Sequence, residues 1–313
     1  MSTIETEIVV VGGGPAGLSA ALTLSRARRR IIVIDNGEPR NAPALGAHGL
    51  LGQEGISPFE LLRKGREEVT SYGGQVITGR VTDARAEGNG FRVRTDAGHD
   101  VTARTVLLAT GTRDNLPDIP GLAARWGKDV IHCPYCHGWE VRDQRVGVLA
   151  TGPISALQAL MFSQWSSDVR FFPQGLDYSV ADLAKLSATG IRVDTRTITG
   201  IDTDEDHLAG VHLEDGSTFP LDALVVPTST TARLDGLDGL GVEVSESPAG
   251  TAVAVDTAGH TSVPGVWAAG NLTQPATQVS EAAADGTRVA RNINTELIFQ
   301  DADRAVAETE NNR

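Results

Sequence analysis

A glycine-rich turn near the amino terminus most constrains the fold of this chain. The turn reads Gly12-Gly13-Gly14-Pro15-Ala16-Gly17, and it lies between a continuous apolar run at 8–11 and an alanine- and leucine-rich stretch at 18–27. A second apolar run at 31–34 follows and leads into Asp35. Continuous apolar runs are typical of parallel strands that are buried on both faces. The pattern therefore predicts a strand–helix–strand unit.

The spacing of the glycines predicts a dinucleotide site in this unit. The G-x-G-x-x-G pattern is formed by Gly12, Gly14 and Gly17. The first glycine permits a tight turn, the second lets the backbone approach a pyrophosphate, and the third lets the helix pack on the strand. The helix amino terminus at Pro15 and Ala16 faces the phosphates in such a site. Asp35 is placed to accept hydrogen bonds from a ribose.

The same layout returns in the second half of the chain. A strand is predicted at 145–150, a turn at Thr151-Gly152-Pro153, a helix at 154–166 and a strand at 169–172. The first glycine of the fingerprint is replaced by Ala150 and the third by Ser155, and the second strand ends without an acid or an arginine cluster. We interpret this unit as a domain with the shape of a nucleotide site but without its chemistry. A divergent, working NADPH site is the alternative.

These patterns predict an α/β protein of two doubly wound Rossmann-like domains, the first split in sequence by the second. We place the first part of the dinucleotide domain at 1–116, the inserted domain at 117–231 and the return at 232–313. Short segments at 75–77, 91–94 and 105–109 predict a small antiparallel insertion. A strand at 263–269 and a helix at 278–292 belong to the return, and the polar tail from 300 is expected to fray.

The two cysteines of the chain, Cys133 and Cys136, stand together in one C-x-x-C. This spacing favours a redox pair over a structural bridge. A zinc site needs about four ligands, and the flanking His132 and His137 are badly placed to complete a tetrahedron, so we predict no metal. His137 directly follows the second cysteine and is the first candidate for moving protons, with His132 second. A solvated histidine without a catalytic role is the alternative for each.

The overall charge argues against some partners. The formal net charge is −13 and the isoelectric point is about 5.0, so nucleic acid and anionic membranes are not expected partners. The basic run at 26–30 falls at the end of a predicted helix, where cations favour the helix dipole. No secretory signal is visible and no apolar stretch approaches the ~20 residues that span a bilayer. We therefore expect a cytoplasmic enzyme.

Four motifs occur in an order that resembles the low-molecular-weight thioredoxin reductase family of flavoproteins, over nearly the whole chain. They are the glycine turn, Ala109-Thr110-Gly111, the C-x-x-C and Ala268-Ala269-Gly270. The resemblance implies a homodimer, a rotating second domain, and FAD held by the first domain and the return. It implies FAD contacts at the glycine turn and at Asp35, Val81, Ala109, Thr110, Gly111, Gly270, Asn271, Gln278 and Val279.

Three departures from that family point to a subgroup. Asn271 stands where the family has an acid near the ribityl chain, His137 stands where an acid commonly follows the second cysteine, and the NADPH fingerprint is absent. These departures, with the stretch from Pro39 to Gly52, resemble the dithiol oxidases of the gliotoxin and holomycin pathways. The resemblance places Asn41 and His48 near the flavin.

The resulting hypothesis is an FAD-dependent dithiol oxidase of secondary metabolite biosynthesis. A small dithiol attacks the disulfide at Cys133, the substrate's second thiolate resolves the mixed disulfide, and His137 handles protons. The resemblance assigns to Cys136 the transfer of electrons to FAD, and oxygen is the final acceptor, giving hydrogen peroxide. One alternative is a disulfide reductase that uses NADPH or another donor. A second alternative is a flavin-bound redox sensor without turnover.

Overall fold

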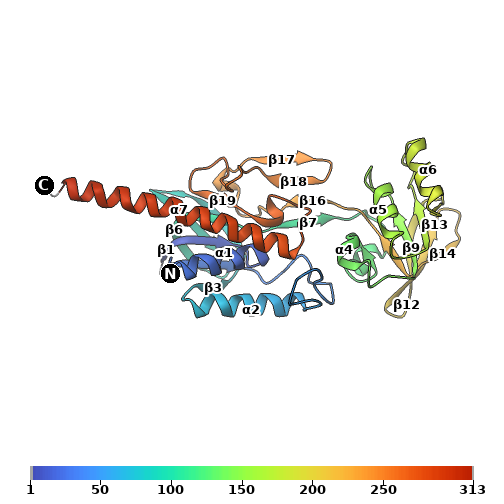
Figure 1. Ribbon diagram of the computed structural model, residues 1–313, viewed down its shortest axis with the longest axis horizontal. Coiled ribbons are helices and arrows are strands. Elements are labelled where there is room, and N and C mark those ends of the chain that lie inside the picture. The colour runs from blue at the N-terminus through green and yellow to red at the C-terminus, as the bar shows by residue number, and fades with distance from the viewer. Residues whose placement is uncertain (1–2, 312–313) are drawn as a thin grey trace. The chain divides into compact units, whose positions relative to one another are not determined.

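The computed structural model describes residues 3–311, and the chain divides into two compact units (Figure 1). Unit 1 comprises Met1–Arg40, Pro58–Arg113 and Thr230–Arg313, and unit 2 comprises Asn41–Ser57 and Asp114–Ser229. The chain thus passes between units at 113/114 and 229/230, a few residues before the predicted boundaries. The segment Asn41–Ser57 groups with unit 2, whereas the sequence analysis placed it in the first domain.

The central sheet of unit 1 has the predicted parallel order, with strands arranged β3-β2-β1-β6 and β19 paired to β6. Val10 in β1 pairs with Val33 on one side and Leu107 on the other, so the apolar run lies in the middle of the sheet. An antiparallel insertion is present, formed by β4 and β5, which extend the sheet beside the first half of β6. Of the three segments predicted for it, only 91–94 belongs to it, because 75–77 lies in β3, parallel to β2, and 105–108 pairs in parallel with β1. The strands are β1 (Ile4–Val11), β2 (Ile31–Asp35), β3 (Gln75–Thr78), β4 (Val81–Glu87), β5 (Gly90–Thr95), β6 (Asp100–Leu108) and β19 (Val266–Ala268).

Helices α1 (Pro15–Arg26), α2 (Pro58–Ser71) and α7 (Val279–Asn311) form one side of unit 1. Ile8 and Val10 point into the apolar core shared with these helices, and Val9 and Val11 point into the core on the opposite side, which is why β1 is apolar at every position. Helices α1 and α7 lie side by side (Figure 1). Gly286 allows this contact, because a Cβ there would stand 2.0 Å from the carbonyl oxygen of Ala16.

A four-stranded sheet in the order β17-β18-β16-β7 carries both passages of the chain between the units. The sequence analysis did not predict these strands. They are four residues each and largely polar or exposed, so they show little of the alternation that marks a half-buried strand. They are β7 (Thr112–Asn115), β16 (Ser229–Ala232), β17 (Val244–Ser247) and β18 (Gly250–Val253), with the short helices η1 (Asp238–Leu240) and η2 (Gly270–Leu272) nearby in sequence.

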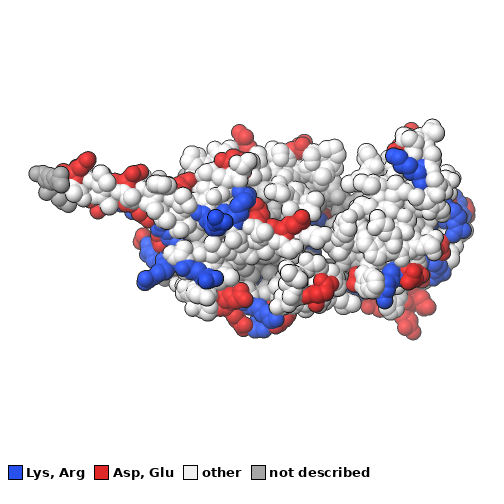
Figure 2. Space-filling view, in the orientation of Figure 1, with Lys and Arg blue, Asp and Glu red and all other residues white. Residues whose placement is uncertain are grey.

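The carboxyl-terminal helix is longer than predicted. We expected a helix at 278–292 and a frayed tail from 300, but α7 continues to Asn311. The stretch 301–310 contains no glycine or proline, and six of its ten residues (three alanines, two glutamates and one arginine) are good helix formers even when exposed. Figure 2 shows acidic side chains along this exposed end of α7.

A histidine ties α7 to the loop before β19. His260 Nδ1 lies 2.9 Å from a carboxylate oxygen of Asp256, and His260 Nε2 lies 3.0 Å from one of Glu296 in α7. The imidazole packs against Trp267 with ring centroids 3.7 Å apart. Burial acts to lower the pKa of His260, but the hydrogen bonds to Glu296 and Asp256 outweigh it and raise the pKa. The bridge is strongest when His260 is protonated.

Unit 2 contains a parallel sheet in the order β11-β10-β9-β15-β8. Helices α5 and α6 pack on one face, and the antiparallel strands β12, β13 and β14 close an apolar core on the other. Its strands are β8 (Val130–Ile131), β9 (Arg145–Leu149), β10 (Asp168–Phe172), β11 (Arg192–Val193), β12 (Ile198–Asp204), β13 (His207–Leu213), β14 (Thr218–Pro220) and β15 (Ala223–Val225). Its helices are α3 (Leu122–Arg125), α4 (Pro134–His137), α5 (Ser155–Phe162) and α6 (Val180–Ala188).

A buried arginine holds the start of unit 2 together. The side chain of Arg125 is only 7% exposed, and it pairs with Asp129 and, at 2.7 Å, with Asp206. Asp129 also accepts a hydrogen bond of 2.8 Å from the backbone N–H of Leu208. The segment 117–121, whose sequence Pro-Asp-Ile-Pro-Gly is typical of a linker, lies within this unit, where Ile119 packs against the core. None of the helices within 3–311 is long and apolar enough to cross a membrane.

Candidate functional site

The glycine turn of unit 1 has the close contacts that its sequence pattern requires. Gly12 has φ +107°, and a Cβ there would stand 2.4 Å from the carbonyl oxygen of Ala109. A Cβ at Gly17 would stand 1.9 Å from the carbonyl oxygen of Gly12. The first glycine therefore lets β1 approach the end of β6, and the third lets α1 pack directly on the turn.

The second glycine of the pattern faces open space. A Cβ at Gly14 would meet no atom of the described chain within 4 Å, apart from its own neighbours. Helix α1 begins at Pro15, and no side chain forms a capping hydrogen bond at Gly14. The first N–H groups of this 12-residue helix are directed at that space. An uncapped helix terminus with room before it fits a pyrophosphate, so the turn fits the FAD that the sequence predicts.

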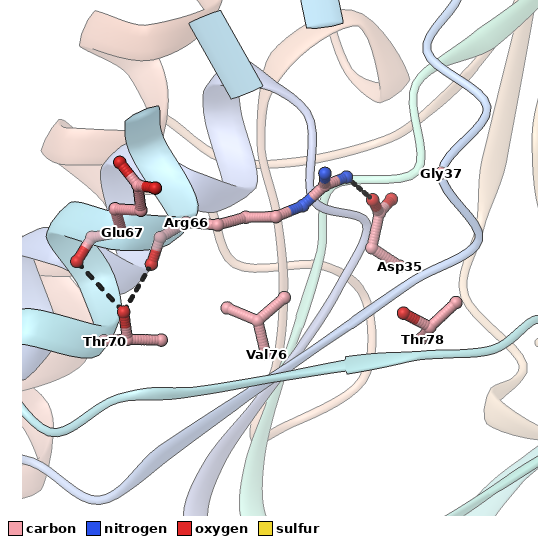
Figure 3. A pocket seen from close by; sticks show the side chains of 7 residues that line it. All are labelled: Asp35, Gly37, Arg66, Glu67, Thr70, Val76 and Thr78. Carbon is pink, nitrogen blue, oxygen red and sulfur yellow. Dashed lines mark hydrogen bonds and ion pairs between the residues drawn. The ribbon is translucent and has the colours of Figure 1, made fainter. Parts of the chain in front are cut away.

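Asp35, at the end of β2, lies beside the turn and beside a pocket of about 340 Å³. Its Oδ1 accepts a hydrogen bond of 3.0 Å from Gly13 N, and its Oδ2 lies 2.6 Å from Arg66 Nη2. Figure 3 shows Arg66 extending from α2 toward the carboxylate. Each carboxylate oxygen has a further lone pair, so Asp35 can still accept from a ribose. The pocket is lined by Asp35, Gly37, Arg66, Glu67, Thr70, Val76 and Thr78.

The predicted motif Ala109-Thr110-Gly111 lies where the chain leaves unit 1. Thr110 Oγ1 donates a 2.6 Å hydrogen bond to the carbonyl oxygen of Arg233, and Arg233 N donates to the carbonyl oxygen of Gly111 at 3.0 Å. These two hydrogen bonds join the segment in which the chain leaves unit 1 to the segment in which it returns. Gly111 has φ +69°, and a Cβ there would meet no described atom within 4 Å beyond its neighbours.

The return segment places Gly270 and Asn271 in η2. Gly270 N donates a 2.8 Å hydrogen bond to Asp285 of α7. Asn271 Nδ2 donates to the carbonyl oxygens of Pro275, at 3.0 Å, and Thr277, at 2.9 Å. The amide therefore orders the loop that leads into α7. Its contact with the ribityl chain of FAD stays a prediction.

Three other predicted FAD contacts lie in unit 1. Gln278 and Val279 stand at the start of α7, where Gln278 N donates a 2.7 Å hydrogen bond to Glu281. Val81 begins β4 and its side chain lies in the apolar core. Their proximity to the isoalloxazine and adenine rings stays a prediction.

The corresponding turn of unit 2 is filled by a side chain. Ser155 Oγ accepts hydrogen bonds from the backbone N–H groups of Thr151, at 3.1 Å, and Gly152, at 3.3 Å. The hydroxyl of Tyr178 donates to the carbonyl oxygen of Gly152 at 2.8 Å. Ser155 is fully buried. The N–H group of Gly152, at the position of the second glycine of the fingerprint, is thereby satisfied within the protein rather than left for a phosphate.

The arginines near β10 are engaged in local contacts. Arg170 lies over the ring of Phe219, with its guanidinium carbon 4.7 Å from the ring centroid. Arg192 pairs with Asp168 at 2.8 Å, and Arg196 pairs with Asp194 at 2.7 Å. The strand itself ends at Phe172.

The two cysteines form a disulfide at the start of α4, with Cα atoms 5.2 Å apart. Cys133 precedes the helix, and its carbonyl oxygen accepts hydrogen bonds from the N–H groups of Cys136 and His137. The helix rests on Trp165, which packs edge-on against Tyr135. A Cβ at Gly138 would stand 2.7 Å from the Trp165 ring, so glycine is needed for this contact.

The two histidines beside the cysteines have different surroundings. His137 Nδ1 is buried and makes no hydrogen bond within residues 3–311. Burial lowers the pKa of His137, Glu140 opposes this effect, and the nearby His48 adds to it. A neutral imidazole is the form that accepts a proton. His132 stacks on Trp126 with ring centroids 5.7 Å apart.

The structure brings His48 into this group. Its Nδ1 lies 2.7 Å from Glu54 and its Nε2 lies 3.5 Å from Glu140, three residues after His137. Asn41 begins the same segment of unit 2. The predicted proximity of Asn41 and His48 to the flavin is not tested by these contacts and stays a prediction.

Several residues of these sites were missed by the sequence analysis. Glu140 lies about one helical turn after His137 in sequence, so its spacing was a usable signal. Ser155 was noted only as a lost glycine, although serine is a common acceptor for backbone N–H groups in turns. Arg66 and Asp285 reach their partners across 31 and 15 residues, and nothing local in the sequence marks them. The described residues contain no group of three or more metal-ligating side chains.

A sequence profile for the family described as pyridine nucleotide-disulphide oxidoreductase matches residues 6–286. The thioredoxin reductase tcpT of Claviceps purpurea (strain 20.1) is 32% identical over 315 residues, which cover 95% of this chain and 96% of tcpT. The thioredoxin reductase sirT of Leptosphaeria maculans is 31% identical over 94% of this chain and 95% of its own length. The crystal structure of HlmI aligns with a TM-score of 0.91 and 42% identity, over 98% of this chain and 96% of HlmI. The predicted resemblance and the α/β fold are confirmed.

Proposed function

Because the chain belongs to the pyridine nucleotide-disulphide oxidoreductase family, we propose that it is an FAD-dependent dithiol oxidase that closes a disulfide in a small molecule. The flavoprotein character follows from the family. The direction of electron flow is the new element. It rests on one observation, the occupation of the second nucleotide turn by Ser155.

The two glycine turns differ in whether a side chain accepts from the N–H group at the second glycine. Both turns have space at their second glycine and neither helix has a side-chain cap, but in unit 2 the N–H groups of Thr151 and Gly152 donate to the buried hydroxyl of Ser155. To bind a pyrophosphate there, the protein would have to break the hydrogen bonds of a buried hydroxyl, at a cost of about 1–3 kcal/mol. Reduction by a nicotinamide cofactor is therefore disfavoured, and electrons enter from a dithiol.

The disulfide supplies the chemistry of substrate oxidation. A substrate thiolate attacks Sγ of Cys133, and Cys136 leaves as a thiolate. The second substrate thiolate then attacks the substrate sulfur of the mixed disulfide, and Cys133 leaves as a thiolate. The product disulfide leaves, and the electron pair of the substrate remains on the two cysteines.

The remaining roles follow from the surroundings of the disulfide. His137, kept neutral by burial, takes a proton from an attacking thiol. FAD, which the glycine turn of unit 1 would hold, would supply the electron acceptor for the reduced cysteines, and the proposal names oxygen as the final acceptor, which would give hydrogen peroxide. A homodimer and a place in secondary metabolism belong to the same proposal, and the dimer is checked by measuring the mass of the protein in solution.

The experiment that tests the proposal is an anaerobic titration of the holoenzyme, first with NADPH and then with dithiothreitol, following the oxidised flavin band. We expect bleaching by the dithiol and none by NADPH. The Cys136→Ser variant is the control and is expected to keep its FAD but to resist the dithiol. Prompt bleaching by NADPH would favour a disulfide reductase, the function in the names of the relatives tcpT and sirT. Bleaching of Cys136→Ser at the wild-type rate would refute the disulfide route.

A further inference from the structure

We propose that Arg66 of α2 is a positioning residue for FAD, which holds the carboxylate of Asp35 in place for the ribose and balances its charge beside the pyrophosphate. Nothing in the sequence pattern assigned a role to Arg66. The inference rests on the predicted contact between Asp35 and the ribose. It does not depend on the proposed direction of electron flow.

The backbone of Asp35 is fixed by its neighbours in the sheet. Asp35 ends β2 in register with Thr78 of β3, and its carbonyl oxygen accepts a 2.9 Å hydrogen bond from Gly79 N. The carbonyl oxygen of the preceding Ile34 accepts one of 2.8 Å from Gly12 N. Strand pairing therefore sets the place of Asp35 beside the glycine turn, and only the torsions of its side chain remain to be set.

Two donors set these torsions, one on each carboxylate oxygen. Asp35 Oδ1 accepts a 3.0 Å hydrogen bond from Gly13 N, and Oδ2 lies 2.6 Å from Arg66 Nη2. Gly13 permits this approach, because a Cβ there would stand 2.7 Å from both Cβ and Cγ of Asp35. The carboxylate cannot rotate without losing one of its donors. Its remaining lone pairs, which would accept from a ribose, thus keep a fixed direction.

Helix α2 holds Arg66 at the right place for this contact. Leu62 anchors α2 in the apolar core of unit 1. Gly65 lets α2 lie close to α1, because a Cβ there would stand 3.0 Å from Leu18 Cδ1. Figure 3 shows the side chain of Arg66 extending from α2 to the carboxylate of Asp35. The partner of Asp35 is therefore carried by a packed helix of the same unit.

The charge of Arg66 matters because the carboxylate stands next to the expected pyrophosphate. Gly13, which donates to Asp35, directly precedes Gly14, where the open space fits that group. The side chain of Asp35 is already only 14% exposed, and a ribose would cover it further. An unpaired carboxylate there would repel the pyrophosphate and would lose hydration without compensation. Arg66 offsets both effects without having to contact FAD.

The chain offers a matched control in Arg92 of β5. Its ion pair with Asp100 has the same 2.6 Å separation, and the two side chains are similarly covered, at 24% and 15% exposed. Arg92 lies opposite Thr102, which in turn lies opposite Glu5 near the start of β1. The glycine turn follows the other end of β1, about 20 Å of strand away. Arg92→Met therefore makes the same change of charge far from the turn.

The test is a double-mutant cycle on FAD affinity. The full-length protein is freed of its flavin and titrated with FAD, followed by flavin fluorescence, and the melting temperature of each apoprotein is measured in parallel. The variants are Arg66→Met, Asp35→Asn and the two combined, together with Arg66→Lys and the control Arg92→Met.

We expect Arg66→Met to bind FAD roughly tenfold more weakly, which is the scale of coupling between neighbouring charged groups. Arg66→Lys keeps the charge and should lose less affinity, and Arg92→Met should bind FAD as the wild type does. In the Asp35→Asn background, Arg66→Met should change FAD affinity by less than about twofold, because no carboxylate charge remains to be held or balanced.

The assignment is wrong if Arg66→Met keeps the wild-type affinity for FAD. It is also wrong if Arg66→Met weakens binding by the same factor with and without Asp35→Asn, since Arg66 then acts independently of Asp35. An equal loss in Arg92→Met would show a general effect on the fold instead. If Arg66→Met does not fold, Arg66→Gln takes its place in the cycle, with the same outcomes.

Two further outcomes separate this inference from the statements around it. Wild-type FAD affinity in Asp35→Asn would refute the ribose contact on which the inference rests. The cycle uses neither a dithiol nor NADPH, so its failure leaves the proposed function standing. Failure of the proposed function is recognised separately, in the anaerobic titration of the wild-type holoenzyme.

Discussion

Replacement of Gly14 by alanine tests the assignment of the FAD pyrophosphate to the open turn. Gly14 has φ −78° and ψ −174°, an extended conformation that alanine adopts without strain. The new Cβ meets no described atom within 4 Å beyond its neighbours. The apoprotein should therefore keep its stability, or gain about 0.4–1 kcal/mol because the unfolded chain loses conformational freedom.

The same substitution should weaken the binding of FAD, although it leaves the stability of the apoprotein unchanged or raises it. The added methyl stands before the amino terminus of α1, where we place the pyrophosphate, and overpacking a close contact costs about 1–3 kcal/mol. At about 1.4 kcal/mol per tenfold change, FAD should bind roughly 5- to 150-fold more weakly. The assay is titration of apoprotein with FAD, followed by flavin fluorescence, with the melting temperature of the apoprotein measured in parallel.

The chain offers a matched control in unit 2. A Cβ at Gly152 also meets no described atom within 4 Å beyond its neighbours, but the donors of that turn are satisfied by Ser155. Gly152→Ala should therefore leave FAD affinity unchanged. Wild-type FAD affinity in Gly14→Ala, with a folded protein, would refute the placement of the pyrophosphate at this turn.

Two further predictions concern stability. Arg125→Met leaves Asp129 without its buried partner and should lower the unfolding free energy by about 3 kcal/mol in urea denaturation. The control, Arg145→Met, removes an ion pair whose arginine is 45% exposed and should lower the unfolding free energy by at most about 1 kcal/mol. Equal losses of unfolding free energy in the two variants would contradict the argument from burial. The raised pKa of His260 means that its bridge stabilises the fold fully below the unfolded pKa of about 6.5 and is lost as pH rises through the higher folded pKa. Melting temperatures of wild type and His260→Gln should therefore converge above that pKa, and a constant difference would show that protonation is not involved.

Local sequence patterns were sufficient to predict the first strand–helix–strand segment of unit 1. The strand at 8–11, the glycine turn and the strand at 31–34 were predicted because each pattern has a short-range cause: burial on both faces, or a backbone approach that only glycine permits. The parallel sheet followed, since a strand–helix–strand unit has essentially one way to close. Polar four-residue strands such as β17 and the extension of α7 beyond 300 lacked an equally clear pattern.

The chemistry of the sites depended on contacts that sequence spacing does not encode. The amide nitrogen of Asn271 orders the loop before α7, a role that the sequence did not indicate, and its contact with a cofactor stays a prediction. Ser155 looked like a lost glycine, and the structure shows its hydroxyl accepting hydrogen bonds from the backbone N–H groups of the turn. The structure adds two carboxylate partners of His48 in unit 2 that the sequence did not indicate, and the predicted proximity of His48 to the flavin stays a prediction.

The sequence by itself determined the family, the glycine turn and the pairing of the two cysteines in one C-x-x-C, because these depend on residues that are neighbours in the chain. Only the tertiary structure showed that Ser155 accepts hydrogen bonds from the backbone of the second turn, and that His48 contacts Glu140 in the turn after the disulfide helix. Those properties depend on where a side chain ends after the chain has folded back on itself. Glu140 and His48 are 92 residues apart in the sequence and 3.5 Å apart between their nearest polar atoms.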